Sequence, residues 1–229
     1  MPDIVSGLEI TDIAYGGDGV AHMPDGMTVF VPFTAVGDTV TAKITERRRN
    51  FARAGLESVE TPGAGRVEPL CPYFGRCGGC RYQHLDQATE TAAKAGQLRS
   101  SLKRIAGLAS IPELERMVSS PREYGYRNKI KLEPVGTPTD YGRGPILEYG
   151  FCELDNKTFF VPDLCPLADS RLNELMPKAK TTKWGRRNAS RRHPGALTLR
   201  VTGAGETHLF FGYAPAGIPW LYETVLDRD

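Results

Sequence analysis

The stretch that most constrains the fold is a cysteine run, Cys71-Pro-Tyr-Phe-Gly-Arg-Cys77-Gly-Gly-Cys80, which places three thiols within ten residues. Gly78 and Gly79 allow the backbone to turn tightly between the last two thiols. Thiolates at this spacing converge on one metal centre. We therefore expect a metal site here, and a fourth ligand elsewhere in the chain.

Two other cysteines are available as the fourth ligand. Cys165 is followed by proline, as is Cys71, and proline after a ligating cysteine recurs in iron-sulfur binding runs. Cys152 lies instead in an apolar, aromatic stretch with Tyr149 and Phe151, where a cysteine is most often a small buried hydrophobe. We favour Cys165 and keep Cys152 as the alternative.

The ligand spacing favours an iron-sulfur cluster over zinc. Structural zinc sites bring their ligands in two close pairs, whereas here a group of three precedes one distant cysteine. Gaps of five and then two residues are nearest the plant-type run of four and then two, which indicates a two-iron cluster. Spacing by itself leaves the number of irons open. Five cysteines without an export signal also argue against a disulfide framework.

Length and composition set wider bounds. The chain has 229 residues, of which 40% are hydrophobic, so one large domain or two modest ones are expected. We expect no membrane span and no secretion signal, because no apolar run reaches the required length, and we expect a cytoplasmic protein. The formal net charge of +2 conceals clusters of basic residues. Such clusters suit a polyanion, although a solvated surface without a partner is the other interpretation.

The pattern of apolar residues predicts a fold that is mainly β with some α. Residues 1–62 show short alternating segments separated by glycine-rich turns, which predict a small five-stranded barrel. The glycines at 16, 17 and 19 are expected in hairpin turns rather than a phosphate loop. Residues 63–229 are expected to form an α+β domain. Its elements are helices over 87–106 and 167–176 and strands over 127–132, 146–152, 158–161, 196–201 and 207–213.

Three motifs together resemble the N-terminal half of the RNA uracil-5-methyltransferase family, which methylates uridines of 23S rRNA and tRNA. They are the run Cys71–Cys80 with the following Tyr82-Gln-His84, the element Gly125-Tyr-Arg-Asn-Lys129, and Cys165-Pro166. The first sixty residues are similar to the TRAM domain of that family, an RNA-binding barrel related to the OB fold. The resemblance implies a [4Fe-4S] cluster held by Cys71, Cys77, Cys80 and Cys165. It outweighs the two-iron indication from spacing.

The catalytic motifs of that family do not occur in this sequence. They are a Gly-rich S-adenosylmethionine loop, an Asp-Pro-Pro motif and a nucleophilic cysteine followed by Asn-Pro. We therefore expect the RNA-recognition and cluster-binding portion of an RNA uridine methyltransferase, not catalytic on its own, with S-adenosylmethionine bound only by full-length members and the catalytic domain separate or missing. The alternatives are a stand-alone RNA-binding iron-sulfur protein and, less favoured, an electron carrier. The cluster is expected to be structural rather than redox-active.

The expected partner is RNA, with rRNA favoured over tRNA. A small barrel can present cations together with aromatic rings on which unpaired bases stack, and a uracil to be methylated must leave its stack. A basic strand and a basic segment near residue 185 would extend this surface. The expected RNA-binding residues are Arg47, Arg48, Arg49, Phe51, Arg53, Arg127, Lys129, Lys131, Lys183, Arg186, Arg187, Arg191 and Arg192.

Overall fold

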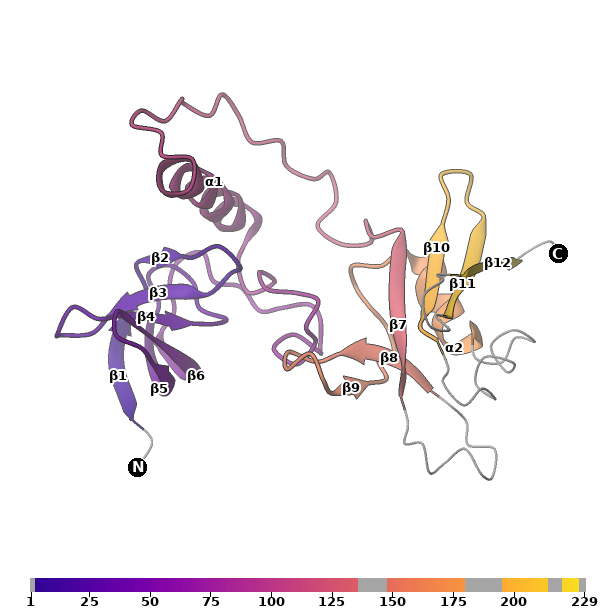
Figure 1. Cartoon of the computed structure of the whole chain (residues 1–229), viewed down its shortest axis with the longest axis horizontal. Helices are drawn as coiled ribbons and strands as arrows, with labels where there is room; N and C mark the ends of the chain where they lie inside the picture. Colours follow the sequence, from indigo (N-terminus) through magenta and orange to yellow (C-terminus); the bar gives the residue numbers. More distant parts are fainter. Residues whose placement is uncertain (1–2, 136–147, 180–194, 214–219, 227–229) are drawn as a thin grey trace. The chain divides into compact units, whose positions relative to one another are not determined.

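The structure is a computed structural model that describes residues 3–135, 148–179, 195–213 and 220–226. It divides into two compact units, each built around a sheet (Figure 1). Unit 1 comprises Met1–Gly75 and Cys80–Ser120, and unit 2 comprises Arg76–Gly79 and Pro121–Asp229. No helix in the described part of the chain is both long and apolar enough to cross a membrane. The domain bounds expected from sequence, 1–62 and 63–229, stay a prediction.

Unit 1 contains a strongly curled six-stranded sheet in the order β1-β5-β6-β4-β3-β2 (Figure 1). All neighbours are antiparallel except β4 and β6, which are parallel. The strands are β1 (Ile4–Glu9), β2 (Asp12–Ile13), β3 (Gly19–His22), β4 (Thr28–Val31), β5 (Thr39–Arg47) and β6 (Phe51–Thr61).

The sheet therefore has six strands rather than the expected five, because the first segment of the chain divides into two strands that pair with different neighbours. β1 pairs with β5, whereas β2 pairs with β3 at the opposite edge of the sheet. Ile10 lies between them, and its amide donates to the Asp38 carbonyl while its own carbonyl accepts from the Gly37 amide. Local periodicity cannot show such a change of partner, because it depends on residues almost thirty positions away.

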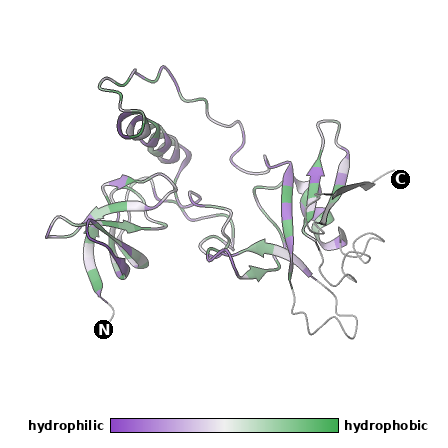
Figure 2. Cartoon of the chain, in the orientation of Figure 1, coloured by the Kyte–Doolittle hydropathy of each residue, from purple (hydrophilic) through white to green (hydrophobic). Residues whose placement is uncertain are grey.

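Alternation of apolar and polar residues places one side of the unit 1 sheet in a core, as expected for half-buried strands. Its buried members include Ile10, Ile13, Val29, Val31 and Val40. Figure 2 shows the same alternation of hydropathy along the strands. The predicted character of the chain, mainly β with some α, is confirmed.

Helix α1 (Gln87–Arg104) follows the cysteine run. Asp86 caps its N-terminus: the Asp86 carboxylate accepts a hydrogen bond from the Thr89 amide at 2.7 Å, which satisfies one of the unpaired donors of the first turn. The helix ends at Arg104 rather than at the expected Ala106, and the chain leaves it through Gly107, whose φ of 68° suits glycine.

Unit 2 has a second six-stranded sheet, antiparallel throughout, in the order β12-β11-β10-β7-β8-β9. Strand β12 was not expected from the sequence. The elements are β7 (Lys129–Val135), β8 (Glu148–Cys152), β9 (Phe159–Phe160), α2 (Ser170–Ala179), β10 (Leu197–Val201), β11 (Thr207–Tyr213) and β12 (Trp220–Leu226).

Helix α2 packs on one face of this sheet through Leu172 and Met176, which join a core with Ile130, Leu132 and Leu199. The helix begins three residues later than expected. The preceding residues form a turn instead, in which the Ala168 amide donates to the Cys165 carbonyl. The Asp169 carboxylate accepts from the Arg171 amide at 3.1 Å, as a capping side chain does.

The short segment Arg76–Gly79 packs on unit 2 beside the turn that follows β8. The Gly78 amide donates to the Cys152 carbonyl, and the Arg76 carbonyl accepts from the Leu154 amide. The Arg76 guanidinium pairs with the Glu153 carboxylate at 2.8 Å. A side chain at Gly78 would place its Cβ 2.9 Å from the Glu153 carbonyl oxygen, so this close approach of two backbones requires glycine.

Candidate functional site

Five of the expected RNA-binding residues lie at one turn of unit 1, between the end of β5 and the start of β6. Arg47, Arg48 and Arg49 are exposed, and Phe51 is half-buried at the first position of β6. The Arg48 amide donates to the Phe51 carbonyl at 2.8 Å and closes the turn. This group, Arg47–Arg53, is called the arginine hairpin below.

Arg53 is fixed against two aromatic rings. Its guanidinium carbon lies 5.9 Å from the ring centres of both Phe30 and Phe51, and those rings meet edge to face at 5.8 Å. The pairing of β4 with β6 places Phe30 opposite Arg53. Cation–π contacts of this kind orient the charge without neutralising it. The hairpin thus presents a cation and an aromatic ring side by side.

Most cations of the arginine hairpin have an acidic neighbour. Arg47 pairs with Asp3 at 3.1 Å, Arg48 with Glu46 at 2.5 Å, and Arg53 with Asp18 at 3.4 Å. These pairs are exposed, and exposed pairs contribute about 0 to 1 kcal/mol to stability. An RNA phosphate can therefore replace the carboxylates at little cost.

A second group of expected contacts lies on β7 of unit 2. Lys129 and Lys131 are exposed and point away from the core residues Ile130 and Leu132. The neighbouring strand adds Arg200, which is exposed and lies directly opposite Lys129. Arg200 was not among the expected contacts, because only the pairing of β7 with β10, some seventy residues apart, brings it there.

The remaining expected contacts divide into two groups. Arg127 is half-buried, and its backbone is held by the Leu167 carbonyl and the Asp169 amide. The others lie outside the described residues, so their contribution stays a prediction: Lys183, Arg186, Arg187, Arg191 and Arg192.

Two of the expected cluster ligands, Cys71 and Cys80, belong to unit 1 and share one neighbour. The Gln83 side chain accepts from the Cys71 amide at 3.3 Å and donates to the Cys80 sulfur at 3.2 Å. An amide donor to a thiolate is the kind of contact that tunes sulfur ligands. Gln83 was quoted in the sequence motif but was assigned no role.

The other two expected ligands, Cys77 and Cys165, belong to unit 2. The backbone of Cys77 forms an isolated antiparallel β-bridge with the backbone of Glu153. Cys165 packs on the core and is held by a reciprocal pair of bonds with Asn173: its amide donates to Asn173 Oδ1 at 2.8 Å, and its carbonyl accepts from Asn173 Nδ2 at 3.1 Å. Cys152 ends β8.

All five cysteines carry thiols. Among the described residues, however, no three Cys, His, Asp or Glu side chains gather in a way that could hold a metal ion. The described side chains therefore form no assembled metal centre, and we derive no chemical step through the [4Fe-4S] cluster implied by the resemblance.

Comparison with known proteins bears on the class of this protein. Residues 7–56 match the TRAM domain. An RNA methyltransferase of Gloeobacter violaceus is 31% identical over 96% of this chain and 49% of its own length. A 23S rRNA (uracil(1939)-C(5))-methyltransferase RlmD of Alkalilimnicola ehrlichii is 34% identical over 74% of this chain and 36% of its own length. The crystal structure of Pyrococcus abyssi tRNA (uracil-54, C5)-methyltransferase with S-adenosyl-L-homocysteine superposes with a TM-score of 0.47 and 23% identity, covering 87% of this chain and 44% of that one.

The chain is thus a TRAM-containing relative of RNA methyltransferases. It spans about half the length of the first of these relatives.

The expectation of a non-catalytic portion, and with it the adaptor and electron-carrier alternatives, is wrong. A relative that matches 96% of this chain is an RNA methyltransferase, and this finding overturns the expectation. That expectation was based on the absence of the family's catalytic motifs from the sequence. The cytoplasmic location stays a prediction.

Proposed function

We propose that the protein is an S-adenosylmethionine-dependent RNA methyltransferase that modifies C5 of a uridine. The match to RNA methyltransferases over nearly the whole chain carries this proposal, and the TRAM domain at residues 7–56 supports RNA as the substrate. S-adenosylmethionine supplies the methyl group. The RlmD relative favours rRNA over tRNA.

The role we propose for the arginine hairpin is to hold single-stranded RNA. Its exposed cations contact phosphates, which fixes the position of the strand without reading its sequence. The Phe51 ring, supported by Phe30, supplies a surface on which an unpaired base stacks. On unit 2, Lys129 and Arg200 add positive charge along the outer side of β7 and β10. Each of these two surfaces contacts the RNA that carries the uridine.

Methyl transfer tests the function directly. The purified protein is incubated with S-adenosylmethionine labelled in its methyl group and with either rRNA or tRNA that lacks uridine methylation, and the nucleosides are then separated. We expect label in 5-methyluridine, with more of it in rRNA than in tRNA. Label in a different nucleoside, or in none, would contradict the proposal.

We also propose that Cys71, Cys77, Cys80 and Cys165 are the ligands of a [4Fe-4S] cluster. The support is the resemblance of the cysteine run and of Cys165-Pro166 to the RNA uracil-5-methyltransferase family, together with the use of thiolates as the protein ligands of such clusters. Iron and acid-labile sulfide are counted after anaerobic purification of the wild-type chain and of two matched variants, Cys165→Ser and Cys152→Ser. We expect Cys165→Ser alone to lower both counts. Equal losses in the two variants, or zinc without iron in the wild type, would refute this ligand set.

A further inference from the structure

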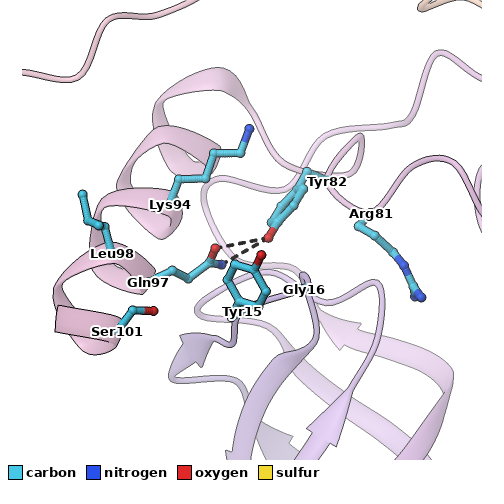
Figure 3. A pocket seen from close by; sticks show the side chains of 8 residues that line it. All are labelled: Tyr15, Gly16, Arg81, Tyr82, Lys94, Gln97, Leu98 and Ser101. Atoms are coloured by element: carbon cyan, nitrogen blue, oxygen red, sulfur yellow. Dashed lines mark hydrogen bonds between the residues drawn. The ribbon is translucent and has the colours of Figure 1, made fainter. Parts of the chain in front are cut away.

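A cavity of about 530 Å³ lies in unit 1 between the first hairpin turn and helix α1 (Figure 3). Neither the arginine hairpin nor the cysteine run includes it. The turn contributes Tyr15 and Gly16, the end of the cysteine region contributes Arg81 and Tyr82, and the helix contributes the rest. The residues lining the cavity are Tyr15, Gly16, Arg81, Tyr82, Lys94, Gln97, Leu98 and Ser101.

The walls of this cavity are held in place by specific bonds. The Gln97 amide donates to the carbonyls of Ile13 and Ala14, at 3.3 and 3.0 Å, and so ties α1 to the turn. Gln97 also lies 3.2 Å from the Tyr82 hydroxyl, which fixes the edge of that ring. The cavity is therefore formed before any ligand arrives.

The turn itself depends on two successive glycines. Gly16 and Gly17 have φ values of 101° and 96°, a region that disfavours other residues. A Cβ at Gly17 would lie 2.9 Å from the Arg81 Cβ and 3.4 Å from the Tyr82 ring. The predicted turn role is confirmed for Gly16 and Gly17, whereas Gly19 begins β3. The close approach explains how Tyr15 comes to stand opposite Tyr82 (Figure 3).

The two tyrosine rings have different surroundings. Lys94 Nζ lies 5.4 Å from the Tyr82 ring centre, and Tyr82 packs against the unit 1 core. The Tyr15 residue, in contrast, is 89% exposed. A large ring held on a glycine turn at the mouth of a cavity is a surface on which a flat ligand can stack.

Positive charge flanks the cavity. Lys94 and Arg81 lie on opposite sides of the Tyr82 ring (Figure 3), and none of the lining residues is acidic. Lys94 does pair with Glu90 at 2.5 Å, one helical turn away. That pair is exposed, so a ligand phosphate can displace the carboxylate at little cost.

The turn that contributes Tyr15 to the cavity also contacts the arginine hairpin. Asp18, in the same turn as Tyr15, lies 3.4 Å from the Arg53 guanidinium. Arg53 is the cation that lies against the rings of Phe30 and Phe51. The cavity and the hairpin therefore share one structural element of unit 1.

We propose that this cavity binds one unpaired nucleotide of the RNA, with its base on the Tyr15 ring and a phosphate beside Lys94 or Arg81. The inference rests on the proposed function, and it adds a second stacking position next to the arginine hairpin. The volume lies within the range of about 300 to 1,000 Å³ typical of small-ligand sites. An aromatic ring with nearby cations is the arrangement that binds single-stranded nucleic acid without reading its sequence.

Binding of a short uridine-rich single-stranded RNA tests the proposal. Tyr15→Ala should weaken binding by about 5-fold to about 150-fold, the range measured for loss of one stacked base, whereas Tyr15→Phe should leave it unchanged. Lys94→Met should lower the slope of log affinity against log salt by about 0.7. The matched control is Lys103→Met, which removes an exposed cation from the same helix outside the cavity.

Removing single bases from the RNA, while keeping its backbone, makes the test specific to stacking. The same RNA is prepared with one abasic nucleotide at each position in turn, and each is bound to wild type and to Tyr15→Ala. If a base stacks on Tyr15, one abasic position weakens wild-type binding and abolishes the difference between the two proteins. This non-additivity is not expected if Tyr15 only supports the fold.

The possible outcomes separate this inference from the proposed function. Wild-type RNA binding that is unaffected by Tyr15→Ala overturns the cavity assignment and leaves RNA methylation standing. Full additivity at every abasic position does the same. Wild type that binds no RNA and methylates none overturns both.

Discussion

The Arg66 guanidinium holds the Asp38 carboxylate inside unit 1, with Arg66 Nη2 2.7 Å from Asp38 Oδ2. The Asp38 side chain is 0% exposed, and it also accepts from the amides of Ala35 and Gly63, at 2.7 and 2.8 Å. Burial by itself would raise the pKa of Asp38, but these hydrogen bonds and the Arg66 charge hold the pKa below its ordinary value. The turn before β5 is thereby tied to the segment after β6.

Replacing Asp38 by asparagine should destabilise unit 1 by about 3 to 5 kcal/mol, because the largely buried guanidinium of Arg66 loses its counter-charge. Urea denaturation at neutral pH measures the change. Glu57→Gln, at an exposed position of β6, is the control and should change the free energy of unfolding by less than about 0.5 kcal/mol. Equal midpoints for Asp38→Asn and wild type would show that the ion pair does not stabilise the fold.

Acid should remove the stabilisation that the Asp38–Arg66 ion pair gives to unit 1. The pKa of Asp38 is lower in the folded state than its ordinary value of 3.8, so the unfolded chain binds the proton more tightly. The stabilisation is therefore complete above about pH 4 and is lost as the pH falls through the folded-state pKa. Asp38→Asn should lack this part of the acid transition.

His84 should make the stability of unit 1 depend on pH in a higher range. Its side chain lies beside the rings of Phe33 and Phe74, and its Nε2 is 3.0 Å from the Thr34 carbonyl oxygen. The carbonyl can only accept, so Nε2 carries the proton in the neutral ring. Nδ1 is buried and has no hydrogen-bond partner within the described residues. Burial lowers the pKa of His84, and the bond to Thr34 opposes this only in part.

The sign of the effect follows from that lowered pKa. The unfolded chain takes up a proton near the ordinary value of 6.5, whereas the folded protein resists it, so stability is complete above about pH 6.5 and declines below it. The decrease in the urea midpoint between pH 7.5 and pH 5.5 should become smaller in His84→Asn. An unchanged decrease would assign the effect to other groups.

Gly150 fixes the distance between β8 and β9. A Cβ at this position would lie 1.9 Å from the Phe160 carbonyl oxygen and 3.0 Å from Val135 Cγ2. Gly150→Ala should therefore destabilise unit 2 by about 3 kcal/mol, at the upper end of what overpacking costs. Gly203→Ala is the matched control, because its Cβ would meet nothing within 4 Å. Similar thermal midpoints for the two variants would contradict this account.

Local sequence signals were sufficient for most elements of this fold, although not for β12. The helical pattern over 87–106 predicted α1, which Asp86 caps, and the alternation around Ile130 predicted β7. Both depend on neighbours in the chain, since capping and strand periodicity act over a few residues.

Features that depend on distant residues were missed. The split of β1 from β2, the packing of Arg76–Gly79 on unit 2, and the place of Arg200 beside Lys129 each depend on pairing across tens of residues. The cavity beside Tyr15 was missed for the same reason, because its walls come from three separate segments. A glycine pair next to a tyrosine is too common a pattern to indicate a binding site.

The arginine hairpin provides the sharpest test of RNA contact, because removing its cation and removing its aromatic ring should have different effects on RNA binding. Arg53→Met should lower the slope of log affinity against log salt by about 0.7, since one phosphate contact is lost. Phe51→Leu should weaken binding by roughly 1 to 3 kcal/mol without changing that slope, since stacking releases no counterions. Lys157→Met, an exposed cation in a turn of unit 2, is the control.

The acid within the hairpin should respond in the opposite direction. Glu46 lies 2.5 Å from Arg48 and 3.7 Å from Arg53, so it competes with phosphate for both cations. Glu46→Gln should tighten RNA binding, and the gain should be largest at low salt, where charges are least screened. If Glu46→Gln weakens binding, or if Arg53→Met leaves the salt slope unchanged, the RNA does not lie across this hairpin, and the contact must be made elsewhere in the chain.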